Sequence, residues 1–194
     1  MLDTADQNAT MDSLSIEAAA PGVWMLTARQ RLMMARDELF PFFADAANLA
    51  RITPPEMSFE ILTPQPIVMR AGTLIDYQIR TWGIPMRWRT EITEWNPPIE
   101  FVDTQLRGPY GEWVHRHRFI NLTGGTTLME DHVRFRLPLG RVGAVAGPIV
   151  RRQLRRIFEY RNATVTTLLE SSGAVRAAPR GYTVSPSVHP RRRR

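Results

Sequence analysis

The sequence predicts an α+β domain in which a curved antiparallel sheet of about seven strands wraps around one long C-terminal helix. Two observations carry this prediction. Between residues 58 and 137, stretches of alternating apolar and polar residues are joined by short connections of turn type, a pattern typical of successive antiparallel hairpins. Residues 147–172 then place apolar side chains at helical spacing along one stripe. A half-buried sheet needs a covering layer, and this one long helix is available to supply it.

The expected elements follow in chain order. The stretch VWMLTARQRL at 23–32 predicts the first strand. Two short helices follow within 35–53, because apolar residues recur there at helical spacing and Pro41 interrupts the pattern. The next six strands are expected at Ser58–Thr63, Thr73–Trp82, Met86–Trp95, Glu100–Arg107, Glu112–Leu122 and Thr126–Leu137.

Composition predicts a folded domain at residues 22–171. Residues 1–21 are polar, small and acidic, and residues 172–194 consist largely of Ala, Pro, Ser and Arg, so both segments are expected to be disordered. The first segment lacks the basic and apolar regions of a signal peptide, and no apolar run is long enough to span a bilayer. We therefore expect a cytoplasmic protein. The absence of cysteine excludes disulfides and thiolate sites.

The alternation along each strand predicts which side chains face the helix-covered interior. In Glu112–Leu122 the inward set is Trp113, His115, His117 and Phe119. Arg161 lies beside the apolar stripe of the last helix, so its guanidinium is expected to reach the interior and to pair with an acid, since an unpaired buried charge is very costly. The polar side chains expected in this interior are Tyr77, Asp103, Gln105, His115, His117, Asp131 and Arg161.

At this point the chain resembles the helix-grip superfamily that includes START lipid-transfer domains, polyketide cyclases and Bet v 1 proteins, together called SRPBCC. More narrowly, it resembles a bacterial subgroup of ligand-binding members labelled cyclase/dehydrase-like, for which no substrate is known. The resemblance spans about residues 40–161. The matching stretches are FFADAANLARITPPEMSFEILTP, GTLIDYQIRTWGIPMRW, PPIEFVDTQLRGPYGEWVHRHRF, GGTTLMEDHVRFRLP and IFEYR.

A sheet that grips a helix leaves a space that tends to become a ligand cavity. We expect the cavity to bind a hydrophobic small molecule of lipid, isoprenoid or polyketide/aromatic type, with the protein acting as a carrier or binding protein. Entry would pass the loops near WGIP and GPYG and the start of the last helix. The candidate ligand-binding residues are Tyr77, Trp88, Asp103, Gln105, Trp113, Met129, Phe135, Leu154, Phe158 and Arg161.

His115, His117 and Asp131 leave several interpretations open. They can form a structural carboxylate–imidazole network, or fix the polar end of a ligand at the bottom of an apolar pocket. They can also perform acid–base chemistry in a cyclase/dehydrase-type enzyme, with Tyr77 and Arg161 polarising a carbonyl or phenol. The His-x-His spacing with Asp131 further has the outline of a two-His, one-carboxylate metal site. Nothing else in the resemblance indicates a metal, so we expect no metal or other cofactor. A last alternative is an interaction module without a ligand.

The net charge of +6 comes from the C-terminal segment, where six arginines and no acid follow Glu170. Within the last helix, four further arginines fall on its solvent flank: Arg151, Arg152, Arg155 and Arg156. They form either an ordinary solvated face or, with the arginine-rich tail, a patch for transient contact with an anionic membrane. No nucleic-acid-binding motif accompanies them, so no specific nucleic-acid partner is expected.

Overall fold

A computed structural model describes residues 12–81, 83–138, 140 and 145–171. In this part of the chain the sheet has eight antiparallel strands in the order β1-β2-β8-β7-β6-β5-β4-β3. The strands are β1 (Ser13–Ala20), β2 (Val23–Leu32), β3 (Glu60–Ile61), β4 (Leu74–Thr81), β5 (Ile84–Asn96), β6 (Glu100–Arg107), β7 (Glu112–Leu122) and β8 (Thr126–Arg136). The helices are α1 (Arg36–Ala44), α2 (Leu49–Ile52) and α4 (Gly147–Ser171), with 3-10 turns η2 (Ala46–Asn48) and η3 (Pro55–Met57).

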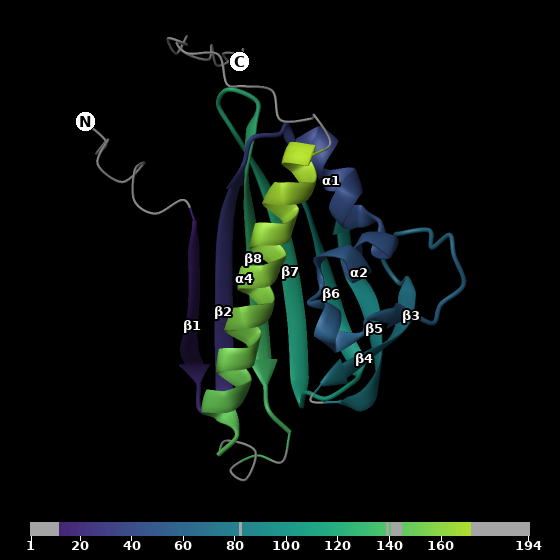
Figure 1. Ribbon diagram of the computed structural model, residues 1–194, viewed down its shortest axis with the longest axis vertical. Coiled ribbons are helices and arrows are strands. Elements are labelled where there is room, and N and C mark those ends of the chain that lie inside the picture. The colour runs from purple at the N-terminus through teal and green to yellow at the C-terminus, as the bar shows by residue number, and fades with distance from the viewer. Residues whose placement is uncertain (1–11, 82, 139, 141–144, 172–194) are drawn as a thin grey trace, which may run out of the picture.

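Helix α4 runs along one face of the curved sheet, and α1 and α2 lie beside it over the same face (Figure 1). Its buried residues after the first turn recur every three or four positions: Leu154, Phe158, Arg161, Val165 and Leu169. This spacing places one stripe of the helix against the sheet, as the sequence predicts. The helix-grip α+β fold is therefore confirmed, and no helix of the described residues is long and apolar enough to cross a membrane.

The N-terminal segment corrects one prediction, because residues 13–20 form an edge strand where disorder was expected. Strand β1 pairs with β2 in the register Leu14↔Ala28 and Ile16↔Leu26. Both Leu14 and Ile16 pack partly buried against the apolar core, whereas Ala18 is exposed. Two apolar residues among polar and small ones suffice here, because the ladder to β2 supplies the backbone hydrogen bonds. Residues 1–11 and the expected arginine-rich tail lie outside the described residues.

The two short α-helices are confirmed, but the break between them falls at Asp45 and not at Pro41. Helix α1 continues through Pro41, whose ring removes only the hydrogen bond to the carbonyl of Asp37 in the first turn. Burial of Leu39 and Phe43 on either side of the proline holds the helix together. Asp45 then accepts a hydrogen bond from the Ala47 amide at 2.9 Å and starts the next turn.

The six strands expected after the helices are all present: β6 and β7 have the predicted bounds, and the other four have shifted ends. Strand β3 is shorter than expected, because Ser58 adopts a left-handed backbone conformation with φ of 43° and only Glu60 and Ile61 pair with β4. Trp82, the expected end of the next strand, lies outside the described residues. The inward face of β7 is as predicted, since Trp113, His115, His117 and Phe119 are all buried.

Candidate functional site

A cavity of about 600 Å³ lies between the inner face of the sheet, helix α4 and the α1–α2 segment. Its walls are mostly apolar. Nine of the residues singled out from the sequence line it: Tyr77, Trp88, Asp103, Trp113, His115, His117, Leu154, Phe158 and Arg161. Residues of the WGIP and GPYG stretches line it as well, among them Ile84, which begins β5 and is 63% exposed, and Tyr110 in the β6–β7 connection. The alternation of the strands and the stripe of the helix therefore placed nine of the thirteen predicted site residues at the cavity wall.

The other four predicted residues lie elsewhere. Met129 packs in the core beneath α1, and Phe135 is fully buried in the aromatic cluster around Trp113. Gln105 is engaged with the β6–β7 connection, where its Nε2 donates to the Tyr110 carbonyl at 2.8 Å. Asp131 is buried on β8, with its carboxylate against the two histidines of β7. Inward direction on a strand thus places a residue in the core, but does not decide whether it reaches the cavity.

Sequence reasoning missed the side of the cavity that α1, α2 and the following segment build. The apolar residues there include Phe42, Phe43, Leu49, Ile52 and Phe59. Their helical spacing was visible in the sequence, but the spacing alone does not say over which part of the sheet the helices pack. The second missed feature is Tyr110, whose ring lies 4.7 Å from Trp113 and 5.6 Å from Trp88 in the β6–β7 connection.

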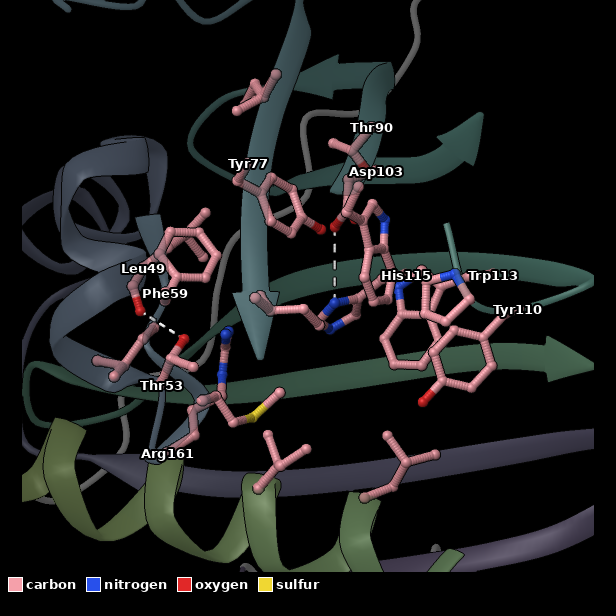
Figure 2. A pocket seen from close by; sticks show the side chains of 18 of the residues that line it. Leu49, Thr53, Phe59, Tyr77, Thr90, Asp103, Tyr110, Trp113, His115 and Arg161 are labelled. Carbon is pink, nitrogen blue, oxygen red and sulfur yellow. Dashed lines mark hydrogen bonds and ion pairs between the residues drawn. The ribbon is translucent and has the colours of Figure 1, made fainter. Parts of the chain in front are cut away.

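A buried polar cluster occupies one part of the cavity wall. His115 Nε2 is hydrogen-bonded to Asp131 Oδ1 at 2.9 Å, and His117 Nδ1 lies 2.8 Å from the same oxygen and 3.3 Å from Arg161 Nη2. On the opposite side of the two rings, Asp103 Oδ2 lies 3.1 Å from His117 Nε2 and 3.6 Å from His115 Nδ1. Arg161 reaches from α4 toward the sheet (Figure 2). Its Nη2 donates to Asp131 Oδ1 at 3.3 Å. The expected pairing of Arg161 with a buried acid is thus present.

The adjacent strands explain why these groups meet. Asp103 on β6 is directly opposite His115 on β7, and His117 is directly opposite Asp131 on β8. Side chains two apart on β7 face the same side, so both imidazoles lie between the two carboxylates. The ring centroids of His115 and His117 are only 3.8 Å apart.

The electrostatics of the cluster give each histidine a different state. Burial opposes a charge on His117, but the hydrogen bonds to Asp103 and Asp131 outweigh it and raise the pKa of this imidazole. For His115, burial and the neighbouring His117 outweigh the carboxylates and lower the pKa. Burial would raise the pKa of Asp131, but Arg161 and the two histidines hold it well below its usual range. These shifts favour the charged form of His117 and the neutral form of His115, so Arg161 and His117 are the groups that offset the two carboxylates.

Two further polar groups belong to the wall. Burial and the nearby Asp103 carboxylate raise the pKa of Tyr77 well above its usual range, so its hydroxyl stays protonated. This hydroxyl and the Asp103 carboxylate point toward one another (Figure 2). The Trp88 indole stacks on Tyr77 at 5.6 Å, and among the described residues its buried Nε1–H has no hydrogen-bond partner. A buried donor without a partner is rare in a folded protein.

Most of the arginines predicted on the solvent flank of α4 make contacts with other parts of the protein. Arg151 stacks on the Trp24 ring at 3.9 Å, and Arg155 donates to the Leu14 carbonyl at 3.1 Å. Arg156 pairs with Glu56 at 2.7 Å, whereas Arg152 is exposed. Three of the four therefore hold neighbouring elements against α4, besides contributing charge to the surface.

Comparison with known proteins supports the fold. No family model and no curated protein matches the chain. Among solved structures, the chain is similar to the Zhui aromatase/cyclase from Streptomyces sp. R1128, with a TM-score of 0.63, 18% identity and coverage of 81% of this chain and 98% of that one. It is also similar to a START superfamily protein from Mycobacterium smegmatis, with a TM-score of 0.59, 14% identity and coverage of 76% and 98%.

A plant protein extends the likeness. Ginseng major latex-like protein 151 from Panax ginseng matches with a TM-score of 0.53 and 10% identity, over 75% of this chain and 97% of that one. Identities this low relate the proteins by fold alone, and fold does not fix function. The chain thus has the helix-grip fold that the START and aromatase/cyclase structures share, as its resemblance to the SRPBCC superfamily implied.

Proposed function

We propose that this protein binds a hydrophobic small molecule in the cavity between the sheet and α4, as a carrier or binding protein. One observation carries the proposal, namely a mostly apolar cavity of about 600 Å³ with a buried polar cluster in its wall. This volume lies within the range of about 300–1,000 Å³ typical of small-molecule sites, which combine apolar walls with a few polar groups that fix orientation. From the sequence we predict that such a carrier acts in the cytoplasm.

The wall indicates the chemistry of the ligand. Trp88, Trp113 and Tyr110 form an aromatic surface suited to a flat or lipid-like body. The Trp88 Nε1–H and the Arg161 guanidinium are donors, so they favour an oxygen acceptor such as a carbonyl, phenol or carboxylate at one end of the ligand. We therefore assign the lipid, isoprenoid or polyketide/aromatic classes as ligands.

The second candidate function is a cyclase/dehydrase-type enzyme. The observation that favours it is the pair of imidazoles held by carboxylates in the cavity wall, within a fold that an aromatase/cyclase also has. In an enzyme of this type, His115→Gln would abolish product formation while ligand affinity stays within a few-fold. Loss of binding together with no detectable product from the wild-type protein would remove this candidate.

We further propose that the protein contacts anionic membranes through the first turns of α4. Ile149 is 60% exposed there and Arg152 is exposed, while Val150 and Gln153 on the same turns line the cavity. Basic and apolar side chains at one surface are the combination that binds anionic bilayers. A hydrophobic ligand could thereby move between membrane and cavity with little exposure to water.

Binding of the fluorescent probe N-phenyl-1-naphthylamine tests the ligand cavity directly. Ala46 in η2 is 4% exposed and lines the cavity, whereas the next residue, Ala47, is exposed. An indole at position 46 has the cavity to occupy, so Ala46→Trp should reduce probe affinity at least tenfold. The matched variant Ala47→Trp should leave the affinity unchanged. Equal affinity in both variants, each with an unchanged melting temperature, would place the probe outside the cavity and contradict the proposal, as would the absence of binding to the wild-type protein.

A further inference from the structure

We propose that Asp103, His115 and His117 form a binding site for one divalent transition-metal ion at the wall of the cavity. One oxygen or nitrogen from each residue lies within 4.8 Å of the others. The Asp103 Oδ2 atom is 3.1 Å from His117 Nε2 and 3.6 Å from His115 Nδ1. Ligand atoms about 2.0–2.2 Å from a tetrahedral metal lie about 3.3 Å apart, so these distances need to change by only a few tenths of an ångström.

The hydrogen bonds of the two histidines are the second observation that supports this site. Both rings have their other nitrogen beside the same carboxylate oxygen, Asp131 Oδ1, at 2.9 Å for His115 Nε2 and 2.8 Å for His117 Nδ1, and Arg161 Nη2 lies 3.3 Å from that His117 nitrogen. Histidines that bind metals almost always donate their second ring N–H to a carboxylate or carbonyl, which fixes the tautomer and the ring orientation. Asp131 can fix both rings in this way, so that His115 Nδ1 and His117 Nε2 present lone pairs toward Asp103.

This arrangement differs from the one that the sequence outlined, in which Asp131 was the third ligand. The structure places Asp131 behind the two rings, paired with Arg161 at 3.3 Å, and gives the third ligand position to Asp103 on β6. When both histidines are neutral with a proton on the nitrogen nearest Asp131, the other two ring nitrogens and the Asp103 carboxylate converge as three acceptors, and a cation stabilises this arrangement.

The three ligand residues and their surroundings indicate which metal ions the site would prefer and how many coordination positions it would leave open. Two imidazoles and one carboxylate suit Zn²⁺, Fe²⁺ and Co²⁺, whereas Mg²⁺ and Ca²⁺ prefer oxygen ligands. Three protein ligands leave at least one coordination position open, as in catalytic and not structural sites. All three residues line the cavity, so the open position faces it.

The charges of the cluster also suit a further ligand. With both histidines neutral, the two carboxylates, Arg161 and a divalent ion leave a net charge of about +1. Hydroxide or an anionic oxygen of a cavity ligand would neutralise it. This last step rests on the proposed ligand-binding function, but the metal site itself does not.

Titration with Co²⁺ tests the site, because its visible absorption reports coordination by nitrogen and oxygen. The full chain, stripped of metal with a chelator, should bind one Co²⁺ with micromolar or tighter affinity, and Zn²⁺ should displace it. Asp103→Asn, His115→Asn and His117→Asn should each weaken binding at least 100-fold. Asp131→Asn, which removes the group that orients the rings, should weaken it about 10- to 100-fold.

The matched control is His132→Asn, because His132 lies on β8 with its ring 3.5 Å from Glu130 and away from the cavity. This variant, and His189→Asn in the C-terminal segment, should bind Co²⁺ as the wild type does. Binding that survives in the His115 and His117 variants, or wild-type affinity weaker than millimolar, would overturn the proposal. An unchanged melting temperature shows that each variant is folded, and binding of N-phenyl-1-naphthylamine by the same samples separates failure of the metal site from failure of the hydrophobic cavity.

Discussion

Replacing Asp131 by Asn tests whether the buried polar cluster stabilises the fold as a balanced set of charges. Oxygen Oδ1 of Asp131 lies 2.9 Å from His115 Nε2, 2.8 Å from His117 Nδ1 and 3.3 Å from Arg161 Nη2. The amide keeps the size of the side chain but removes its charge. Arg161 and the charged form of His117 would then share Asp103 as their remaining carboxylate among the described residues of the cluster.

The expected cost follows from these contacts. Removing one partner of a buried ion pair destabilises proteins by about 3–5 kcal/mol, because an uncompensated charge is left behind. The amide oxygen of Asn still accepts one hydrogen bond and His117 can lose its proton, so we expect the lower end, about 3 kcal/mol. This is a large share of the ~5–15 kcal/mol by which domains are stable. Urea unfolding at pH 7 with a chelator present, followed by tryptophan fluorescence, measures the loss.

The matched control is Asp76→Asn on the exposed face of the sheet. Asp76 accepts two hydrogen bonds from Arg89, at 2.7 and 2.8 Å, but side chains of both residues are more than one third exposed. Exposed pairs contribute about 0–1 kcal/mol, so this variant should unfold close to the wild type. A cost below about 1 kcal/mol for Asp131→Asn, or equal costs for the two variants, would refute the view that the cluster is a balanced set of buried charges.

Three further predictions concern the cavity wall, the outer face of the sheet and the surface of α4. Trp88→Phe should lower the affinity for 1-acetylnaphthalene about five- to tenfold, because the carbonyl of this ligand loses the hydrogen bond from the indole N–H. The affinity for 1-ethylnaphthalene, which has no carbonyl, should stay unchanged, and equal losses for the two ligands would contradict the prediction. Although burial opposes the shift, the pKa of Glu130 is lowered, because the hydrogen bond and ion pair with Arg29 outweigh the effect of burial. Glu130 therefore stabilises the fold at pH values above its unfolded pKa, and this stability is lost as the pH falls through the lower pKa of the folded state. The stability difference between Glu130→Gln and wild type should therefore be about 1 kcal/mol at pH 7 and shrink below pH 4 in urea titrations, and a growing difference would be inconsistent with this pairing. Arg152→Glu should weaken sedimentation with phosphatidylglycerol vesicles about fivefold while Arg70→Glu does not, and equal sedimentation of the two would dismiss the membrane contact.

The strand alternation made much of this site predictable. Side chains two apart on a strand share a face, so the apolar neighbours Trp113 and Phe119 fixed the inward direction of His115 and His117. The same rule placed Asp131 on the inner face of β8. The long stripe of α4 likewise predicted that Arg161 would reach an acid.

The register between neighbouring strands and the position of the helices over the sheet could not be predicted from the sequence. Which carboxylate lies beside which ring depends on the pairing Asp103↔His115 and His117↔Asp131, and alternation does not fix the offset between strands. The wall built around Leu49 depends on how α2 packs over the sheet, which is a tertiary contact. Strand β1 was missed because its few apolar residues form a strand only beside β2, so the local composition alone was misleading.

Native mass spectrometry of the freshly purified protein tests the central claim, a hydrophobic ligand held in the cavity, most directly. The account predicts a bound molecule of fixed mass that organic extraction removes. Ala46→Trp, which fills the cavity, should abolish the bound mass, whereas Ala47→Trp should keep it. A protein that carries no extractable molecule and takes up none from a total lipid extract, or a bound mass that is equally retained in both variants, would contradict the account.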